Sequence, residues 1–366
     1  MSREARTTRV LLRLSRTLSD RWSPTATSHI PLTVRGVADS FTCMTGLSPV
    51  ESRSLLAAPE PVQAPFAAAL VALAARRPDV VVLSADLSNY TDLRPFATAY
   101  PDRFIQVGMA EANMMGIAGG LARTGFLPIA VTYGVFATRR AYDQVAMALA
   151  TGDVHAIVVA FLPGITTPFR ATHQATDDLA LMRAIPGMTV IDPADATEVA
   201  SSLHAAAAHH GPIYLRGLRG LVERRFPPGE FHIGKARTVR TGADALVIGT
   251  GLGTSWALDA ADAASQRGIE STVIHAPTLK PFDDELILSA VEGFPVVHVI
   301  ENHSTVGGLA DAVSSALARA GTSTRVVAHG VPDVWAPAGS LDHVRSGLGL
   351  DTDSLALAIT REAGAS

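Results

Sequence analysis

The most informative stretch of this chain is Arg103-Phe104-Ile105-Gln106-Val107-Gly108-Met109-Ala110-Glu111-Ala112-Asn113-Met114-Met115-Gly116-Ile117-Ala118-Gly119-Gly120-Leu121-Ala122. It predicts a short strand, a turn at Gly108, and a helix of small and apolar residues with one carboxylate, Glu111, in its first turn. The helix dipole alone would favour an anion at that position. Because the helix carries almost no other charge, we expect Glu111 to lie against packed apolar surface. A carboxylate in such surroundings binds protons more tightly and suits acid–base chemistry.

Apolar strands alternate with helices on both sides of this stretch, which predicts an α/β fold with two parallel-sheet domains. We expect an N-terminal extension at 1–60, a first domain at 61–225, a linker at 226–240 and a second domain at 241–366. Strands are expected at 80–84, 127–132, 156–161, 189–191, 212–215, 245–249, 271–275, 296–300 and 325–328, and helices in the first domain at 64–75, 138–150, 177–184 and 194–209.

Composition excludes several classes of protein. The net charge of −4 argues against a nucleic-acid partner. Apolar runs such as 155–165 are too short to span a bilayer, so we expect no membrane partner. Cys43 is the only cysteine, which rules out an intrachain disulfide and indicates a reducing, cytoplasmic compartment.

Residues 1–60 differ from the rest, being rich in Arg, Ser and Thr without sustained periodicity. An Arg- and Ser-rich leader poor in acidic residues would fit an organelle transit peptide. We favour a disordered extension or a misassigned start codon, with Met44 as the alternative start.

Several sequence blocks occur in an order that resembles the C-terminal section of the transketolase family, its pyrimidine-binding domain followed by its C-terminal domain. The resemblance covers roughly residue 60 to the C-terminus, and its blocks lie at 107–122, 131–144, 172–174, 179–186 and 192–196.

The resemblance implies thiamine diphosphate as cofactor. It assigns Glu111 to N1′ of the aminopyrimidine, where the carboxylate favours the imino tautomer whose nitrogen removes the C2 proton. Phe136, with Tyr133 beside it, falls where the family places its stacking aromatic side chains. Ordinary core packing is the alternative, and it is the stronger alternative for Tyr133.

The resemblance also implies substrate contacts. His173, in Thr-His-Gln, matches a histidine that exchanges protons near the substrate, so we list it with Glu111 as catalytic. Arg219 matches the position that holds a substrate phosphate, and we expect Arg139 to point toward the site. His303 resembles a recurrent structural histidine of the C-terminal domain.

Three departures from the family pattern bear on the substrate. Gln63 replaces an arginine, Phe169 replaces an aspartate that reads a donor hydroxyl, and Ala112 replaces a glutamine. These changes put pentose-phosphate substrates in doubt. Arg170 is a candidate for binding a carboxylate or another anion.

The family's diphosphate domain has no counterpart in this sequence. Its Gly-Asp-Gly segment and following asparagine hold Mg²⁺, whereas here Gly152-Asp153 is followed by Val154. The resemblance therefore implies the second subunit of a split transketolase. A separate N-terminal subunit would supply the Mg²⁺ and diphosphate ligands in an α2β2 assembly, and the substrate would be a small ketose or 2-oxoacid.

Four alternatives stay open. One is the β subunit of a 2-oxoacid dehydrogenase E1-type enzyme, which passes an acyl unit to a lipoyl or carrier protein. Deoxyxylulose-phosphate synthase shares many motifs but is normally one long chain. A catalytically inactive scaffold is disfavoured because Glu111, Phe136 and His173 occur together. A nucleotide-binding module at Gly249-Thr250-Gly251 is disfavoured because the full Gly-x-Gly-x-x-Gly spacing fails, and a tight turn explains these glycines.

Overall fold

The computed structural model describes residues 60–229 and 231–364. The first half of the described chain is built around a sheet of seven strands. All neighbouring strands are parallel except at one edge, where the pairing is antiparallel. Their spatial order is β12 (Thr278–Lys280), β6 (Thr189–Ile191), β7 (Pro212–Gly217), β5 (Ala156–Phe161), β4 (Leu127–Tyr133), β2 (Val80–Ser84) and β3 (Phe104–Gln106).

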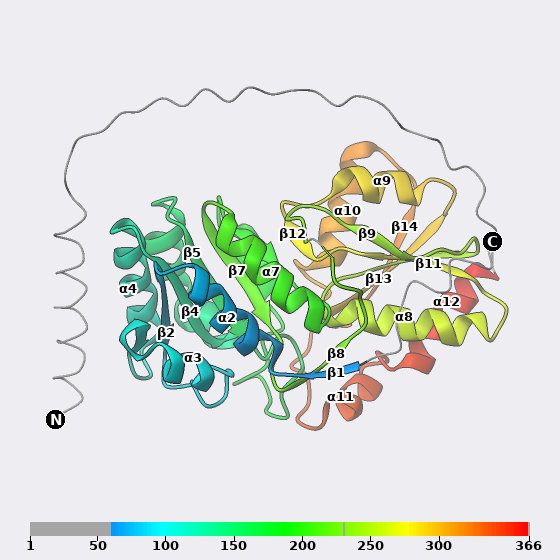
Figure 1. The fold of residues 1–366 in the computed structure, drawn as a ribbon. Coiled ribbons are helices and arrows are strands. Elements are labelled where there is room, and N and C mark those ends of the chain that lie inside the picture. The colour runs from blue at the N-terminus through cyan, green and yellow to red at the C-terminus, as the bar shows by residue number, and fades with distance from the viewer. Residues whose placement is uncertain (1–59, 230, 365–366) are drawn as a thin grey trace. The chain divides into compact units, whose positions relative to one another are not determined.

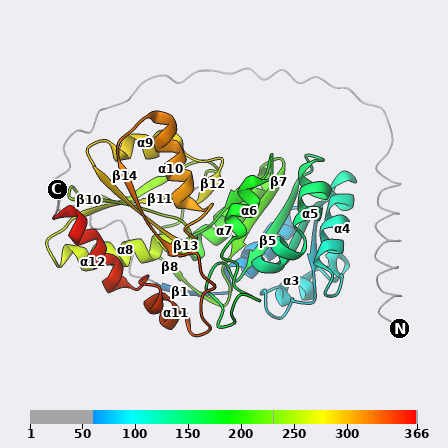
Figure 2. The same ribbon diagram turned by 180° about the vertical axis from the view of Figure 1, so that it is seen from behind.

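Helices cover both faces of this sheet. Figure 1 shows α2 and α7 side by side over one face, and Figure 2 shows α4 beside α5 from behind. All five residues of β2 are buried, as expected for a strand covered on both faces. The helical segments are α2 (Pro65–Arg76), α3 (Arg94–Ala99), η2 (Pro101–Arg103), α4 (Glu111–Arg123), η3 (Phe136–Arg140), α5 (Tyr142–Gln144), η4 (Val145–Ala150), α6 (Asp178–Ala184) and α7 (Ala196–Ala208).

A second sheet of five strands forms the other half, with α8 and α12 on one side of it and α9 and α10 on the other (Figures 1 and 2). Its strands in spatial order are β14 (Arg325–Val331), β13 (Val296–Ser304), β10 (Ala245–Gly249), β11 (Ser271–His275) and the antiparallel β9 (Arg237–Arg240). Its helices are α8 (Leu252–Ser265), α9 (Asp284–Val291), α10 (Leu309–Ala320), α11 (Leu341–Gly347) and α12 (Thr352–Ala363). A two-stranded antiparallel sheet pairs β1 (Glu60–Gln63) with β8 (Leu221–Arg224).

The α/β class expected from the sequence is confirmed, with antiparallel strands at one edge of each large sheet. The prediction of a single helix at 138–150 is wrong, because this region is divided into two π-helical segments with a short α-helical turn between them. The segment expected as a linker, 226–240, contains β9. The expectations for the N-terminal extension fall on residues 1–59, outside the described residues, and Glu60 already belongs to β1.

The two halves are joined by strand pairing and by buried polar contacts. Strand β12 follows β11 in the chain but pairs with β6 of the larger sheet. The ring Nε2 of His275 lies 2.7 Å from Oε2 of Glu198, and both side chains are buried. The second half therefore packs on the first through specific hydrogen bonds as well as apolar surface.

Arg216 in β7 is a buried cation at this junction, with an exposed fraction of 1%. Its guanidinium donates to Asp178 at 2.9 Å, to Asp192 at 3.0 Å and to the carbonyl of Asn302 at 3.3 Å. Burial lowers the pKa of an arginine, but the two carboxylates outweigh it and raise the pKa of Arg216. One charged side chain thus links α6, the end of β6, β7 and β13.

Replacing Arg216 with Met should lower the free energy of unfolding by about 3–5 kcal/mol, because Asp178 and Asp192 would be left as buried carboxylates without their cation. Urea denaturation measures this loss. Arg224 pairs with Glu60 at the surface, where the side chains are 41% and 68% exposed. Arg224→Met is the control and should change stability by less than about 1 kcal/mol. Similar losses in the two variants would contradict this account of Arg216.

His298 in β13 should make stability depend on pH. Its side chain is 1% exposed, and burial lowers the pKa of His298 to about 3. An unfolded histidine titrates near pH ~6.5, so below that pH the unfolded chain binds a proton that the folded chain does not. The stability contributed by neutral His298 is complete above about pH 6.5 and is lost as the pH falls toward 3.

His298→Gln should therefore reduce the loss of unfolding free energy between about pH 6.5 and about pH 4.5 by roughly 2 kcal/mol relative to the wild type. Urea denaturation of both proteins at the two pH values tests this. Parallel pH profiles for wild type and variant would show that His298 does not contribute.

Candidate active site

Glu111 is the first residue of α4, as the sequence predicts. Gly108 precedes it with φ +76°, a conformation that residues with a side chain rarely adopt, and this allows the turn from β3 into the helix. The Glu111 side chain is only 1% exposed. The candidate site therefore contains a buried carboxylate at the start of a helix.

The Glu111 carboxylate has a charged partner, Arg140, which was not predicted from the sequence. Nη1 of Arg140 lies 2.9 Å from each of the two carboxylate oxygens. The Arg140 side chain is 50% exposed, so the pair reaches from the interior to the surface. A buried carboxylate requires such compensation, and the expectation of purely apolar surroundings was therefore incomplete.

Arg140 also contacts Phe136, which begins the same π-helical segment, η3. Its guanidinium carbon lies 4.3 Å from the centroid of the Phe136 ring. Residues four apart on a helix face each other, which brings the guanidinium over the ring. Arg140 thereby connects Glu111 to the aromatic part of the site.

Aromatic side chains continue from Phe136 in a connected cluster. Phe136 lies 5.8 Å from Tyr133 and 5.5 Å from His173 between ring centroids. His173 in turn lies 5.0 Å from Phe169, which is 58% exposed. Burial raises the pKa of Tyr133, so its hydroxyl remains a donor at neutral pH. The structure thus brings four predicted site residues together. Tyr133, Phe136 and His173 are in direct ring contact, and Glu111 is joined to them through Arg140.

The loop that carries His173 is held at its beginning by Asn302 of β13. The Asn302 side chain accepts from the backbone N–H of Ile165 and donates to the carbonyl of Pro163, both at 3.0 Å. Further along, the Gln174 side chain donates to the carbonyl of Pro337 at 3.0 Å. Asn302 was not predicted as a site residue, and its only sequence signal was the Glu-Asn-His motif around it.

The three candidate arginines differ in their surroundings. Arg139 is committed to an ion pair with Asp177 at 2.8 Å, donates to the carbonyl of Ala171, and stacks on Trp335. Arg219 is exposed after β7 and donates to the carbonyl of Tyr90 at 3.1 Å. Within residues 60–229 and 231–364, the guanidinium of Arg170 has no hydrogen-bond or ion-pair partner. Arg170 and Arg219 are therefore more available to a ligand than Arg139.

Two further motifs of the sequence have structural explanations. His303 is fully buried, and burial lowers its pKa to about 4. In the turn at Gly249–Gly251, a Cβ on Gly251 would lie 2.3 Å from the carboxylate of Asp192, and one on Gly253 would lie 2.4 Å from the carbonyl of Ile300. Close packing accounts for these glycines without a nucleotide.

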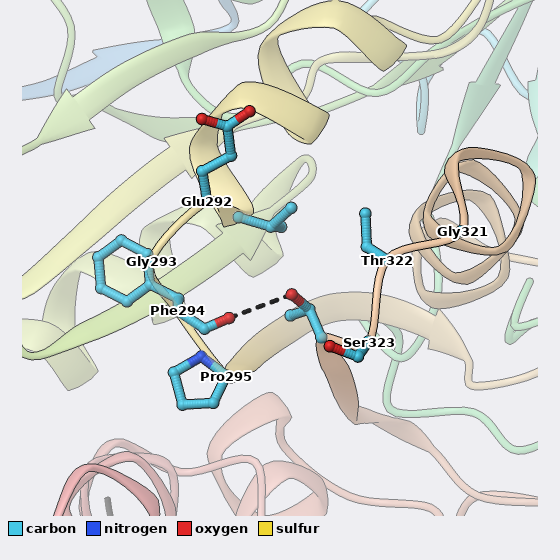
Figure 3. Close-up of a pocket in the computed structure, with 9 residues that line it drawn as sticks. Glu292, Gly293, Phe294, Pro295, Gly321, Thr322 and Ser323 are labelled. Carbon is cyan, nitrogen blue, oxygen red and sulfur yellow. Dashed lines mark hydrogen bonds between the residues drawn. The ribbon is translucent and has the colours of Figure 1, made fainter.

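A shallow hollow lies away from this cluster. Figure 3 shows it between the turn after α9 and the turn after α10, where Thr324 donates to the carbonyl of Phe294 at 3.1 Å. It lies at the amino ends of β13 and β14, whereas ligands of open α/β sheets bind at the carboxyl ends. In the part of the chain that the structure describes, no group of three or more His, Cys, Asp or Glu side chains is placed to hold a metal, and no helix is long and apolar enough to cross a membrane.

Comparison with known proteins identifies the family. Residues 62–224 match the pyrimidine binding domain of transketolase, and residues 234–355 match the transketolase C-terminal domain. The chain is 44% identical over 309 residues to a transketolase family protein, y4mN, of Sinorhizobium fredii, covering 82% of this chain and 89% of that one. It is 36% identical over 275 residues to the 6-deoxy-6-sulfo-D-fructose transketolase subunit SqwH of a Clostridium species, covering 74% and 84%.

A solved structure, described as a split gene transketolase, inactive beta4 tetramer, superposes with a TM-score of 0.74 at 34% identity. The alignment covers 82% of this chain and 97% of that one. These matches define a pyrimidine-binding α/β domain followed by a transketolase C-terminal domain. The chain belongs to the transketolase family, as the sequence motifs indicate.

Gly251→Ala should destabilise the protein by about 3 kcal/mol or more, because the added methyl group meets the buried Asp192 carboxylate and the backbone has φ +50°. Gly268 is the matched control, since it has φ +84° but nothing within 4 Å of the added Cβ. Gly268→Ala should cost only about 1 kcal/mol. Urea denaturation compares the two, and equal losses would contradict the close packing at Gly251.

Proposed function

We propose that this chain is the pyrimidine-binding subunit of a two-component, thiamine-diphosphate-dependent transferase that moves a two-carbon ketol unit. The observation that carries the proposal is the buried Glu111 carboxylate, linked through a planar cationic group to the face of Phe136. Transketolase-family membership supports the same cofactor.

The side chains present fit the aminopyrimidine half of thiamine diphosphate. Glu111 already accepts an N–H from a planar nitrogen group, and Phe136 already offers its face to that same group. These are the two contacts that an aminopyrimidine ring requires, a carboxylate for a ring nitrogen and an aromatic face. When bound, thiamine diphosphate supplies the carbanion and electron sink for breaking and forming a carbon–carbon bond.

The remaining side chains of the aromatic cluster act on the substrate in this proposal. His173 exchanges a proton with a substrate oxygen, which an imidazole can do near neutral pH. Its ring is oriented by the Thr172 hydroxyl, 3.0 Å from Nδ1, and by contact with Phe169. Tyr133 packs beside Phe136 as a second wall of the cofactor site.

The other half of the site belongs to a partner chain in this proposal. A separate N-terminal subunit with the Gly-Asp-Gly segment would hold the diphosphate and Mg²⁺, most simply in a cytoplasmic α2β2 assembly. Support comes from relatives that are themselves named as a transketolase subunit and as a split gene transketolase.

The substrate we propose is a ketose with an anionic end other than a standard pentose phosphate. Phe169 stands where the family has its hydroxyl-reading aspartate, and the exposed Arg170 and Arg219 offer guanidinium groups to an anion. The relative that acts on 6-deoxy-6-sulfo-D-fructose supports an anion different from phosphate. We assign Arg139 to holding the His173 loop through Asp177 rather than to binding substrate.

Glu111→Ala, combined with the proposed N-terminal partner subunit, should lower ketol-transfer turnover by at least about a hundredfold, the usual contribution of a general acid–base group. Turnover is measured with a ketose donor and an aldehyde acceptor. Glu285→Ala is the control, because that side chain is 88% exposed, and its turnover should match the wild type. Unchanged turnover in Glu111→Ala would favour a scaffold role or an unrelated mechanism.

A further inference from the structure

Arg140 makes the two contacts that the proposed function assigns to the cofactor ring. Its Nη1 lies 2.9 Å from both oxygens of Glu111, and its guanidinium carbon lies 4.3 Å from the centroid of Phe136. Glu111 and Phe136 come from different elements, α4 and η3. A single side chain therefore fills the space between the carboxylate and the aromatic face.

A pyrimidine ring bound to the same two residues needs that space. Stacking places ring centroids about 4.5–7 Å apart, and a nitrogen–carboxylate hydrogen bond requires about 2.7–3.2 Å. The guanidinium already lies 2.9 Å from Glu111, and at 4.3 Å from the Phe136 centroid it is slightly closer to that ring than a stacked pyrimidine would be. The ring and the guanidinium therefore cannot be in place at the same time.

The two groups also share their recognition chemistry. A guanidinium and an aminopyrimidine are both flat, and both present N–H groups in the plane of a delocalised nitrogen–carbon–nitrogen unit. A carboxylate binds the edge of such a unit, and an aromatic ring binds its face. Arg140 is thus a chemical mimic of the ring as well as a steric obstacle to it.

We infer that Arg140 is an internal occupant of the aminopyrimidine slot, and that its guanidinium has to leave Glu111 and Phe136 before thiamine diphosphate binds. This inference rests on the proposed function. It adds a closed state in which the chain itself satisfies the buried Glu111 carboxylate.

The surroundings of Arg140 allow it to leave. Its side chain is 50% exposed, and among the described residues the polar and ring contacts of its guanidinium are with Glu111 and Phe136 alone. It can therefore turn into solvent without breaking other polar contacts. Arg139 differs, because Asp177, the carbonyl of Ala171 and Trp335 all hold its guanidinium.

Thiamine is a suitable probe, because it carries the aminopyrimidine ring without the diphosphate that the partner chain would bind. If the closed state is populated to about 90%, it weakens the apparent affinity about tenfold. Arg140→Ala should therefore bind thiamine about tenfold more tightly than the wild-type chain, as measured by calorimetry. Millimolar guanidinium ion should compete with thiamine in this variant, because the free ion refills the vacated space.

Arg319→Ala is the matched control, because that side chain is 60% exposed and pairs with Asp284 rather than with any residue of the site, so this variant should bind thiamine like the wild type. Circular dichroism establishes that each variant is folded. Equal thiamine affinity in the wild type and Arg140→Ala would overturn the inference, and so would weaker binding by Arg140→Ala, which would make Arg140 a positioning group for Glu111.

Failure of the proposed function gives a different result. The double variant Glu111→Ala/Arg140→Ala lacks the carboxylate as well as the guanidinium. Thiamine binding that survives in this double variant, or is absent from every variant, would count against a pyrimidine slot at Glu111. Tighter binding by Arg140→Ala that is lost in the double variant supports both the slot and its internal occupant.

Discussion

The arrangement of the site depends on the buried ion pairs that the guanidinium of Arg216 makes with Asp178 and Asp192. A buried cation is stable only when fully paired, and Asp178 and Asp192 pair this one from two different elements. Asp178 begins α6, directly after the loop that carries His173. The same loop is held at its beginning by Asn302. Polar contacts thus fix both ends of the loop and place His173 against the aromatic cluster.

Glu111 is subject to opposing demands. Binding a cofactor nitrogen requires a buried carboxylate with a free edge, whereas an unpaired buried carboxylate is costly. In this chain Arg140 compensates the charge from a half-exposed position. A half-exposed partner suits such a site better than a fully buried one such as Arg216, because removing a cation from a buried pair would leave an uncompensated buried charge. The two ion pairs therefore differ in role because they differ in burial.

Features of the fold that depend on local sequence pattern could be predicted from the sequence. The apolar run Val80–Ser84 predicts a strand with the same first and last residues as the observed one. The motif around Glu111 predicts the family. The π-helical segments were missed because apolar periodicity does not distinguish them from an α-helix. The partners of Arg216 lie 38 and 24 residues away, so only the fold reveals them. Arg139 was predicted to point toward the site and pairs with Asp177, whereas its neighbour Arg140, which was not predicted, contacts Glu111.

A calorimetric titration of thiamine diphosphate with Mg²⁺ tests the central claim, that this chain supplies half of a cofactor site. It is performed on the chain alone and on the chain co-expressed with a candidate N-terminal subunit that carries the Gly-Asp-Gly segment. The account predicts tight binding in the mixture and not by the chain alone. Tight binding with ketose turnover by the chain alone would contradict the split site, and no binding in either sample would remove the proposed cofactor.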